Sequence, residues 1–398
     1  MPAQSPFLAK KRSVPPLTVY VHFPYCLKKC PYCDFVSYAA ERASIDHRGY
    51  ADAVLTELDR RRSELVGYGR LESIFFGGGT PSLWDTVELG RVLKAILEAF
   101  GAQEGDVEVT AECNPSSLDE DIAHRLVDAG VNRLSIGVQA LDEERLRFLG
   151  RLHDAAGAVA AVRAAIEAAP RVSADLIYAV ADQSPEEAAA EAGRLADLGL
   201  RHISAYALTI EPGTKFGELA RRGRLPLADD GRMVESFFAV EEALAQRGLA
   251  HYEVSNYAVP GEESRHNLGY WRGLDYLGLG CAAYGTLTKP TGAVRYRNLP
   301  EPRRYLAAVA SGAPIELTVE PLSPETRLRE RIMLGLRLRD GFDLAEAARE
   351  TGAEAWTPER EAAAEKLVRK GRLVRDGNRL RVPREGWIWV DDTAAELF

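Results

Sequence analysis

Short apolar runs alternate with longer amphipathic segments along the first half of the chain. Most of these runs lack polar alternation, which is typical of parallel strands that are covered by helices on both faces. The six predicted strands are Leu17–Phe23, Leu71–Phe76, Asp106–Ala111, Arg133–Val138, Val172–Tyr178 and His202–Leu208. The alternation predicts repeated βα units around a parallel sheet, which is either a partial barrel or an open doubly wound sheet.

The segments between these strands place apolar residues at every third or fourth position, which predicts helices. Gly or Pro stands close to several of their ends, as is usual at helix termini. The predicted helices are Ala51–Leu65, Val87–Phe100, Leu118–Ala129, Ala155–Ala168 and Pro185–Leu198.

The pattern changes after Leu208. An acidic helix is predicted near Met233–Gln246, and a Gly- and Tyr-rich stretch from Tyr252 to Tyr296 follows, which we interpret as part of a connector or lid. The rest indicates a small helical domain that ends in a hairpin. Its predicted helices are Arg327–Leu338, Leu344–Thr351 and Pro358–Lys370, and its short strands are Leu373–Val374, Leu380–Val382 and Trp387–Val390.

These patterns divide the chain into four predicted units. They are an N-terminal extension (1–16), a barrel (17–210), a connector or lid region (211–315) and a C-terminal mostly helical domain (316–398).

Composition narrows the class of protein. A chain of 398 residues with 46% hydrophobic and 27% charged residues reads as a soluble globular protein with a large core. The net charge of −9 argues against a nucleic-acid partner, because backbone binding needs an excess of Lys and Arg. We find no apolar stretch that suits a signal peptide or a membrane span, so we expect a cytoplasmic location, with peripheral membrane contact left open.

The strongest chemical signal is the cysteine cluster Cys26, Cys30 and Cys33, immediately after the first predicted strand. In a reducing compartment such a cluster is more often metal-binding than structural. Three thiolates on one loop can hold three irons of a [4Fe–4S] cluster and leave the fourth iron open to a small ligand. The position after a strand places the loop at the carboxyl face of a parallel barrel, where active sites form.

Two alternatives remain open for these cysteines. A zinc site would need a fourth ligand, such as His22 or His47, and a disulfide would leave one thiol unpaired. The two other cysteines, Cys113 and Cys281, stand alone, and we interpret them as small buried apolar residues.

Several further segments lie at the ends of the predicted strands or just beyond them. The glycine-rich run Phe76–Ser82 follows the second strand, where bare backbone can approach a cofactor closely. The others are Glu112–Pro115, Ser135–Gln139, Leu149–His153, Asp175–Tyr178, Tyr252–Ala258 and Met333–Leu338. With the cysteine loop, they resemble the radical S-adenosylmethionine (SAM) superfamily, in the branch of oxygen-independent coproporphyrinogen III dehydrogenase (HemN) and the haem chaperone HemW.

The resemblance implies a partial (β/α)6 barrel with a C-terminal, winged-helix-like domain, and it implies both cofactors of the superfamily. Cys26, Cys30 and Cys33 would ligate the [4Fe–4S] cluster. The residues that match SAM-binding positions are Tyr20, Gly78, Gly79, Thr80, Glu112, Gln139, Arg151 and Asp175. These side chains suit SAM chemically, because a carboxylate can accept from an ammonium or a ribose hydroxyl and an arginine can pair with a carboxylate.

Two features favour the chaperone side of this branch. The dehydrogenase carries a further cysteine two positions past the third, where this chain has Phe35. The run from His266 to Tyr270 matches the His-Asn-x-x-Tyr motif associated with haem, and both residue types can be axial ligands to haem iron. We therefore predict that His266 ligates haem, with Tyr270 as a second candidate.

The chain also departs from its relatives at two segments. Ala179–Asp182 stands where relatives commonly read Gly-Leu-Pro-Gly, and Cys281–Gly285 stands where a His-Ser pair is frequent. The first change should alter a loop on the cofactor side, and the second lies beside the haem motif.

The resemblance implies a haem chaperone that delivers haem to haem-dependent membrane proteins such as respiratory cytochromes. The cluster and SAM would then have a structural or regulatory part, and a homodimer stays open. The alternative is an enzyme of porphyrin biosynthesis that cleaves SAM reductively and decarboxylates coproporphyrinogen III to protoporphyrinogen IX.

Overall fold

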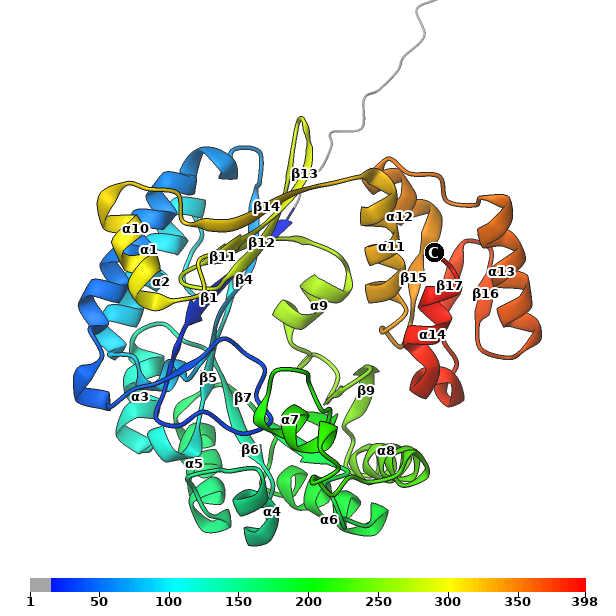
Figure 1. Ribbon diagram of the computed structural model, residues 1–398, viewed down its shortest axis with the longest axis horizontal. Helices are drawn as coiled ribbons and strands as arrows, with labels where there is room; N and C mark the ends of the chain where they lie inside the picture. Colours follow the sequence, from blue (N-terminus) through cyan, green and yellow to red (C-terminus); the bar gives the residue numbers. More distant parts are fainter. Residues whose placement is uncertain (1–15) are drawn as a thin grey trace, which may run out of the picture.

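The computed structural model describes residues 16–398, so the predicted N-terminal extension lies outside the described residues except for Pro16. A 12-stranded sheet forms the centre of the described part of the chain (Figure 1). The six predicted strands are confirmed and lie side by side, all parallel, in chain order. They are β1 (Pro16–Phe23), β4 (Arg70–Gly78), β5 (Glu108–Cys113), β6 (Arg133–Gln139), β7 (Arg171–Tyr178) and β8 (His202–Ala207).

Helices follow these strands as the periodicity predicts, and the barrel is therefore a partial (β/α)6 barrel. Short polar side chains cap the N-termini of these helices. Asp46 accepts from the Gly49 backbone, so the first helix begins at His47, four residues before the predicted start at Ala51. One short helix, α4 (Glu143–Phe148), was not predicted. The predicted helices are α1 (His47–Arg61), α2 (Thr86–Phe100), α3 (Glu120–Asp128), α5 (Ala155–Ala168) and α6 (Pro185–Ala196).

Residues 211–315 contribute strands to the same sheet in addition to helices. In this region β11 (Asp275–Leu279) pairs parallel to β1, and β10 (Asn256–Ala258) pairs antiparallel to β8, so both edges of the barrel sheet are extended. The sequence pattern did not predict these strands because glycines interrupt their apolar runs; Gly278, for example, lies within β11. The Tyr296 hydroxyl donates to the Gly278 carbonyl oxygen at 2.9 Å. The elements are α7 (Lys215–Arg221), α8 (Asp230–Ala245), β9 (Ala250–Glu253), β10 (Asn256–Ala258), α9 (Arg265–Trp271), β11 (Asp275–Leu279), β12 (Tyr284–Lys289), β13 (Gly292–Asn298) and α10 (Pro302–Ser311).

The C-terminal part is mostly helical and winged-helix-like, as predicted: its first three helices pack with a small three-stranded sheet, and a fourth, α14 (Val390–Ala395), packs on the first of them. The edge strand β14 (Glu316–Leu322) leads into it (Figure 1). Its helices are α11 (Pro324–Gly335), α12 (Leu344–Thr351) and α13 (Pro358–Arg369), and its strands are β15 (Phe342–Asp343), β16 (Val374–Asp376) and β17 (Arg379–Arg381).

The predicted strand Trp387–Val390 is wrong. This segment forms a 3₁₀ turn, η5 (Arg384–Trp389), followed by α14 (Val390–Ala395). The Trp387 indole donates to the Val382 carbonyl at 3.1 Å, and its ring meets the His251 ring of the barrel at 3.9 Å. Packing against the barrel therefore overrides the strand preference of this aromatic run.

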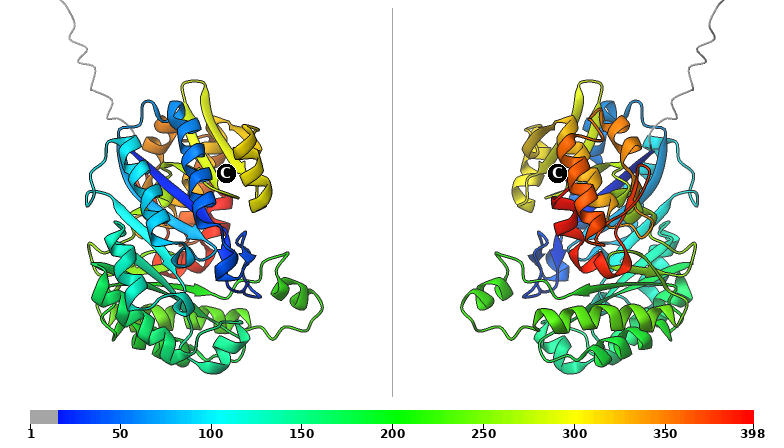
Figure 2. Two further views of the ribbon diagram at one scale, coloured as in Figure 1. Left: turned by 90° about the vertical axis from the view of Figure 1, so that its left-hand side faces the viewer. Right: turned by 90° about the vertical axis from the view of Figure 1, so that its right-hand side faces the viewer.

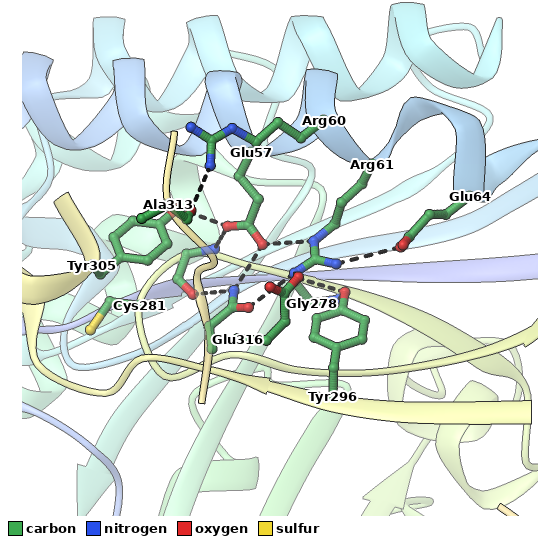
Figure 3. A network of polar contacts seen from close by, with 12 residues as sticks. Glu57, Arg60, Arg61, Glu64, Gly278, Cys281, Tyr296, Tyr305, Ala313 and Glu316 are labelled. Atoms are coloured by element: carbon green, nitrogen blue, oxygen red, sulfur yellow. Dashed lines mark hydrogen bonds and ion pairs between the residues drawn. The ribbon is translucent and has the colours of Figure 1, made fainter. Parts of the chain in front are cut away.

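A buried carboxylate joins the first helix to the strands that extend the sheet (Figure 3). Glu57 of α1 accepts from Arg61 at 2.8 Å, from the Asn298 amide at 2.8 Å, from the Gly280 backbone at 2.8 Å and from the Tyr305 hydroxyl at 2.7 Å. A buried charge with this many donors is well satisfied. The network fixes the turn after β11 against α1.

Among the helices of residues 16–398, none combines the length and the apolar character that crossing a membrane requires.

Candidate functional site

The cysteine loop leaves the carboxyl end of β1 and returns before α1. Two short strands, β2 (Tyr25–Cys26) and β3 (Tyr38–Ala39), pair in parallel and close its base. Cys26, Cys30 and Cys33 are half-buried free thiols on this loop. Beside the loop, the segment that carries α7 projects from the body (Figure 2), and the Phe216 backbone donates to the Pro31 carbonyl at 2.9 Å.

The glycine-rich run after β4 packs directly against the base of this loop. The Gly79 backbone donates to the Phe23 carbonyl at 2.7 Å, and the Thr80 backbone donates to the Tyr25 carbonyl at 2.9 Å. A Cβ atom on Gly79 would lie 2.6 Å from the Tyr25 carbonyl oxygen, so only glycine fits there. The Thr80 hydroxyl donates to the Cys26 sulfur at 3.3 Å.

The three cysteines line one cavity of about 370 Å³ at the carboxyl ends of the parallel strands. The same cavity contains seven of the eight residues predicted to bind SAM, contributed by β4, β5, β6, β7 and the segment after α4. They are Gly78, Gly79, Thr80, Glu112, Gln139, Arg151 and Asp175. Strands far apart in the sequence thus bring the two predicted cofactor sites together.

Tyr20 is the exception among the predicted SAM residues. It lies on β1 within the barrel, where its hydroxyl contacts His22 Nδ1 at 3.0 Å and its ring stacks on Phe75 at 6.2 Å. The structure places it behind Glu112, outside the set of cavity-lining residues. Its contact with SAM stays a prediction.

Two half-buried carboxylates, those of Glu112 and Asp175, line the cavity. Glu112 accepts from the Gly78 backbone at 3.0 Å, and burial together with the nearby Asp175 raises the pKa of Glu112 to about 7. Burial also raises the pKa of Asp175. Paired carboxylates in a desolvated site suit a cationic ligand, because its charge would restore their ionised forms. The ammonium and sulfonium groups of SAM meet that requirement.

Arg151 supplies a positive charge next to the cysteines. Its guanidinium donates to the Gly137 carbonyl at 2.7 Å and to the Cys30 sulfur at 3.4 Å. Its Nε atom has no hydrogen-bond partner among residues 16–398. This arrangement suits a carboxylate or an anionic cluster between Arg151 and the thiolates.

The cysteine loop fits an iron–sulfur cluster better than the alternatives. Both ring nitrogens of His22 are already engaged, by Tyr20 at 3.0 Å and by the Val36 carbonyl at 2.8 Å. Within residues 16–398, no three His, Cys, Asp or Glu side chains converge on a site for one metal ion. Cys26, Cys30 and Cys33 would each hold a different iron of a cluster, which needs the thiolates further apart than a single metal ion does, and the cluster would supply one open iron and electrons for SAM.

Sequence reasoning missed several cavity residues. Ser135, Gly137 and Ile177 lie within the motifs Ser135–Gln139 and Asp175–Tyr178, of which only Gln139 and Asp175 are predicted to bind SAM. Tyr206, Leu208 and Glu211 were not singled out. The available signal was their position at or just beyond the end of the sixth predicted strand, where a barrel gathers ligand-binding residues.

The predicted haem residues lie elsewhere, on α9, and are packed inside the molecule. His266 is only 1% exposed; its Nδ1 atom contacts the Ser73 hydroxyl at 2.8 Å and its ring stacks on Phe75 at 4.8 Å. The Tyr270 ring meets the His266 ring edge-on at 4.9 Å. The backbone groups of Arg265 and His266 donate to the Glu108 carboxylate at 3.1 and 3.0 Å. These contacts fix α9 near the amino-terminal ends of β4 and β5.

The remaining cysteines are buried, as predicted. The Cys281 thiol donates to the Pro300 carbonyl at 2.8 Å in the divergent segment after β11. Cys113 is buried at the end of β5 and also borders the cofactor cavity.

Comparison with known proteins places these features in a family. The Radical SAM superfamily matches residues 20–195, and the HemN C-terminal domain matches residues 322–389. The structure is similar to that of coproporphyrinogen III oxidase (HemN) from Escherichia coli, with a TM-score of 0.80 at 22% identity over 96% of this chain and 90% of that one. At this identity the likeness shows the fold.

Similarity in sequence is higher to the haem chaperone HemW. The Escherichia coli (strain K12) protein is 39% identical over 318 residues, which is 77% of this chain and 81% of the relative. The Mycobacterium tuberculosis (strain H37Rv) protein is 33% identical over 385 residues, 96% of this chain and 95% of the relative. The chain therefore belongs to the radical SAM superfamily, whose members carry a [4Fe–4S] cluster and SAM, and within it to the family of the haem chaperone HemW.

Proposed function

We propose that this chain is a haem chaperone that binds haem through His266. The observation that carries the proposal is the state of that imidazole. Its Nδ1 atom is held by Ser73, whereas its Nε2 atom has no hydrogen-bond partner among residues 16–398. Burial lowers the pKa of His266 to about 3, so the ring is neutral at physiological pH. A neutral imidazole with one nitrogen held and the other unengaged is the form that ligates iron.

Haem cannot reach His266 in the packed conformation, because the ring lies between Phe75 and Tyr270. Ligation therefore requires α9 to move away from β4. The contacts that resist this movement are the Ser73 hydroxyl on the imidazole and the Glu108 carboxylate on the first turn of the helix. We propose Tyr270, one turn further along α9, as the second side chain of the haem site.

The proposed recipients are haem-dependent membrane proteins such as respiratory cytochromes, with the chaperone acting from the cytoplasm. Cys26, Cys30 and Cys33 would hold the cluster, while Glu112, Asp175 and Arg151 would hold the charged ends of SAM. In this proposal the cofactor cavity and α9 form separate ligand sites on one barrel.

The structure offers little for coproporphyrinogen decarboxylation beyond the shared fold. Phe35 replaces the additional cysteine of the dehydrogenase; its side chain is 61% exposed at the edge of the cofactor cavity, and its backbone carbonyl accepts from Lys29 at 3.0 Å. An apolar side chain cannot supply the thiol chemistry of that position.

The proposal is tested by haem titration of the anaerobically reconstituted protein, followed by absorption spectroscopy. His266→Ala should weaken haem binding by at least about tenfold, because an axial ligand is lost. The matched control is His124→Ala, which removes an exposed histidine from α3 and should leave binding unchanged. His266→Cys should retain binding with a shifted absorption band, because a thiolate replaces the imidazole.

Two results would overturn the proposal. One is a haem titration of His266→Ala that superimposes on that of the unmodified chain. The other is conversion of coproporphyrinogen III to protoporphyrinogen IX when the reconstituted protein receives SAM and an electron donor.

A further inference from the structure

Three of the four non-glycine residues with left-handed backbone in residues 16–398 lie at the carboxyl ends of the neighbouring strands β6 and β7, which both contribute residues to the cofactor cavity. Gln139 (φ 69°) ends β6, and Ala179 (φ 57°) and Ala181 (φ 41°) follow β7. Such conformations are unfavourable for residues with a Cβ atom and persist only where the surroundings hold them. The loops therefore need an anchor.

Glu191 of α6 is placed to be that anchor. It is 3% exposed, and its carboxylate accepts from the Leu141 backbone at 2.6 Å, two residues after Gln139. Its other oxygen accepts from the Gln183 amide at 2.7 Å. Gln183 in turn closes the second loop, because its backbone donates to the Val180 carbonyl at 2.9 Å.

One buried carboxylate thus joins both strained loops from behind the cavity. It touches neither the cysteines nor the cavity, since Glu191 is absent from the cavity lining, while Gln139 and Ile177 of the two strands lie in it. Hydrogen bonds to a charged group in a desolvated site are strong. An amide in place of the carboxylate keeps one acceptor oxygen, so its NH2 group would face either the Leu141 N–H or the Gln183 amide donor.

We propose that Glu191 is a positioning residue for SAM: it holds the backbone of Gln139 and of the loop after β7 in the geometry that SAM requires. This inference rests on the SAM cavity and is independent of haem ligation by His266. It also accounts for how alanines occupy positions 179 and 181, where relatives commonly have a Gly-Leu-Pro-Gly run: the carboxylate holds a loop conformation that the alanines themselves disfavour.

The test is SAM binding to anaerobically reconstituted protein, measured by calorimetry. Glu191→Gln should raise the dissociation constant of SAM by about tenfold or more, with the iron content and the cluster absorption unchanged. Glu186→Gln is the matched control, because it makes the same change on an exposed site of the same helix. The exchange variant Glu191→Gln/Gln183→Glu should recover most of the affinity, because it restores one carboxylate and one amide.

An affinity of Glu191→Gln within twofold of the unmodified chain would overturn the inference, and so would failure of the exchange variant to recover any affinity. If Glu191→Gln does not assemble its cluster, Gln183→Met serves as the second variant, because it removes the hydrogen bond between Glu191 and the loop after β7. This variant should weaken SAM binding severalfold, and unchanged binding would overturn the inference. Haem titration separates this result from the proposed function: it should be unchanged in all these variants. An unmodified chain that fails to bind SAM would instead reject the SAM site itself.

Discussion

The cofactor cavity and the haem helix α9 occupy the same barrel but differ in how ready they are for a ligand. The cavity is hollow and lined by thiols, carboxylates and a guanidinium at the carboxyl ends of the strands. The His266 ring is buried near the amino-terminal ends, packed between aromatic rings and tied to Ser73. The cavity is already hollow, whereas the proposed haem site would have to be opened by a movement of α9.

This difference follows from the chemistry of each site. Burying charged groups such as Glu112 and Arg151 without a partner costs free energy. Both line an open cavity, which a charged ligand can fill. A neutral imidazole is tolerated in a packed interior, and α9 can therefore store it there. In the proposed haem site this packing would shield the His266 imidazole until α9 is displaced, and the free energy of opening would then reduce the apparent affinity for haem.

The largest expected effect is on the cofactor cavity. Gly79→Ala would place a Cβ atom 2.6 Å from the Tyr25 carbonyl oxygen and 2.8 Å from that of Phe23, so the base of the cysteine loop must shift. We expect loss of most of the bound iron and of SAM binding, measured by iron analysis and calorimetry. Gly231→Ala on α8 is the control, because its Cβ meets only the Asp229 side chain, at 3.2 Å. Normal iron content in Gly79→Ala would mean that the loop is not preformed.

The next effect is a dependence of SAM affinity on pH. The pKa of Glu112 is about 7 because the carboxyl is buried beside Asp175. Cationic SAM favours the ionised carboxylate, so binding must expel a proton below pH 7. SAM affinity should therefore fall as the pH drops from 8 to 6, by up to about tenfold per pH unit at the acidic end. Calorimetry across this range measures it. The profile of Glu112→Gln should be flatter, and a flat profile for the unmodified chain would contradict the prediction.

A smaller effect is expected at the packed site. A Cβ atom on Gly269 of α9 would lie 2.8 Å from the Thr18 Cγ2 atom of β1, so Gly269→Ala should push the helix outward. Overpacking by about 1 kcal/mol would raise the population of the open form and tighten apparent haem binding roughly fivefold. Equilibrium haem titration measures this change, again with Gly231→Ala as the control. Weaker or equal haem binding would show that opening α9 does not limit access.

The smallest functional effect is expected in the Glu57 network, which lies outside both sites. Tyr305→Phe removes the hydroxyl that donates to Glu57 at 2.7 Å (Figure 3), which should lower the free energy of unfolding by about 1–2 kcal/mol. Urea unfolding measures the loss, and Tyr284→Phe, at a half-exposed tyrosine, is the control. SAM and haem affinities should stay within twofold. A large change in either would mean that this network belongs to a ligand site.

Local pattern predicted most of the barrel because each strand and helix carries its own signal. Most of the six parallel strands lack polar alternation, and the cysteine spacing predicted the cluster loop. The strands β9 to β13, within residues 250–298, escaped prediction because glycines and tyrosines interrupt their pattern. The predicted strand at Trp387 is instead a 3₁₀ turn, whose indole packs on His251. In both places the tertiary neighbours decide.

The sequence by itself determined the fold class, and it predicted ten residues, the three cysteines and seven SAM candidates, that line one cavity. These depend on residue type and on position at strand ends, both of which are local. Only the tertiary structure decided that Tyr20 lies behind the cavity, that Glu191 anchors two strained loops, and that His266 is buried with one nitrogen unengaged. Burial and hydrogen-bond partners are set by segments far apart in the chain, because packing brings α9 against β4 and α6 behind β6 and β7.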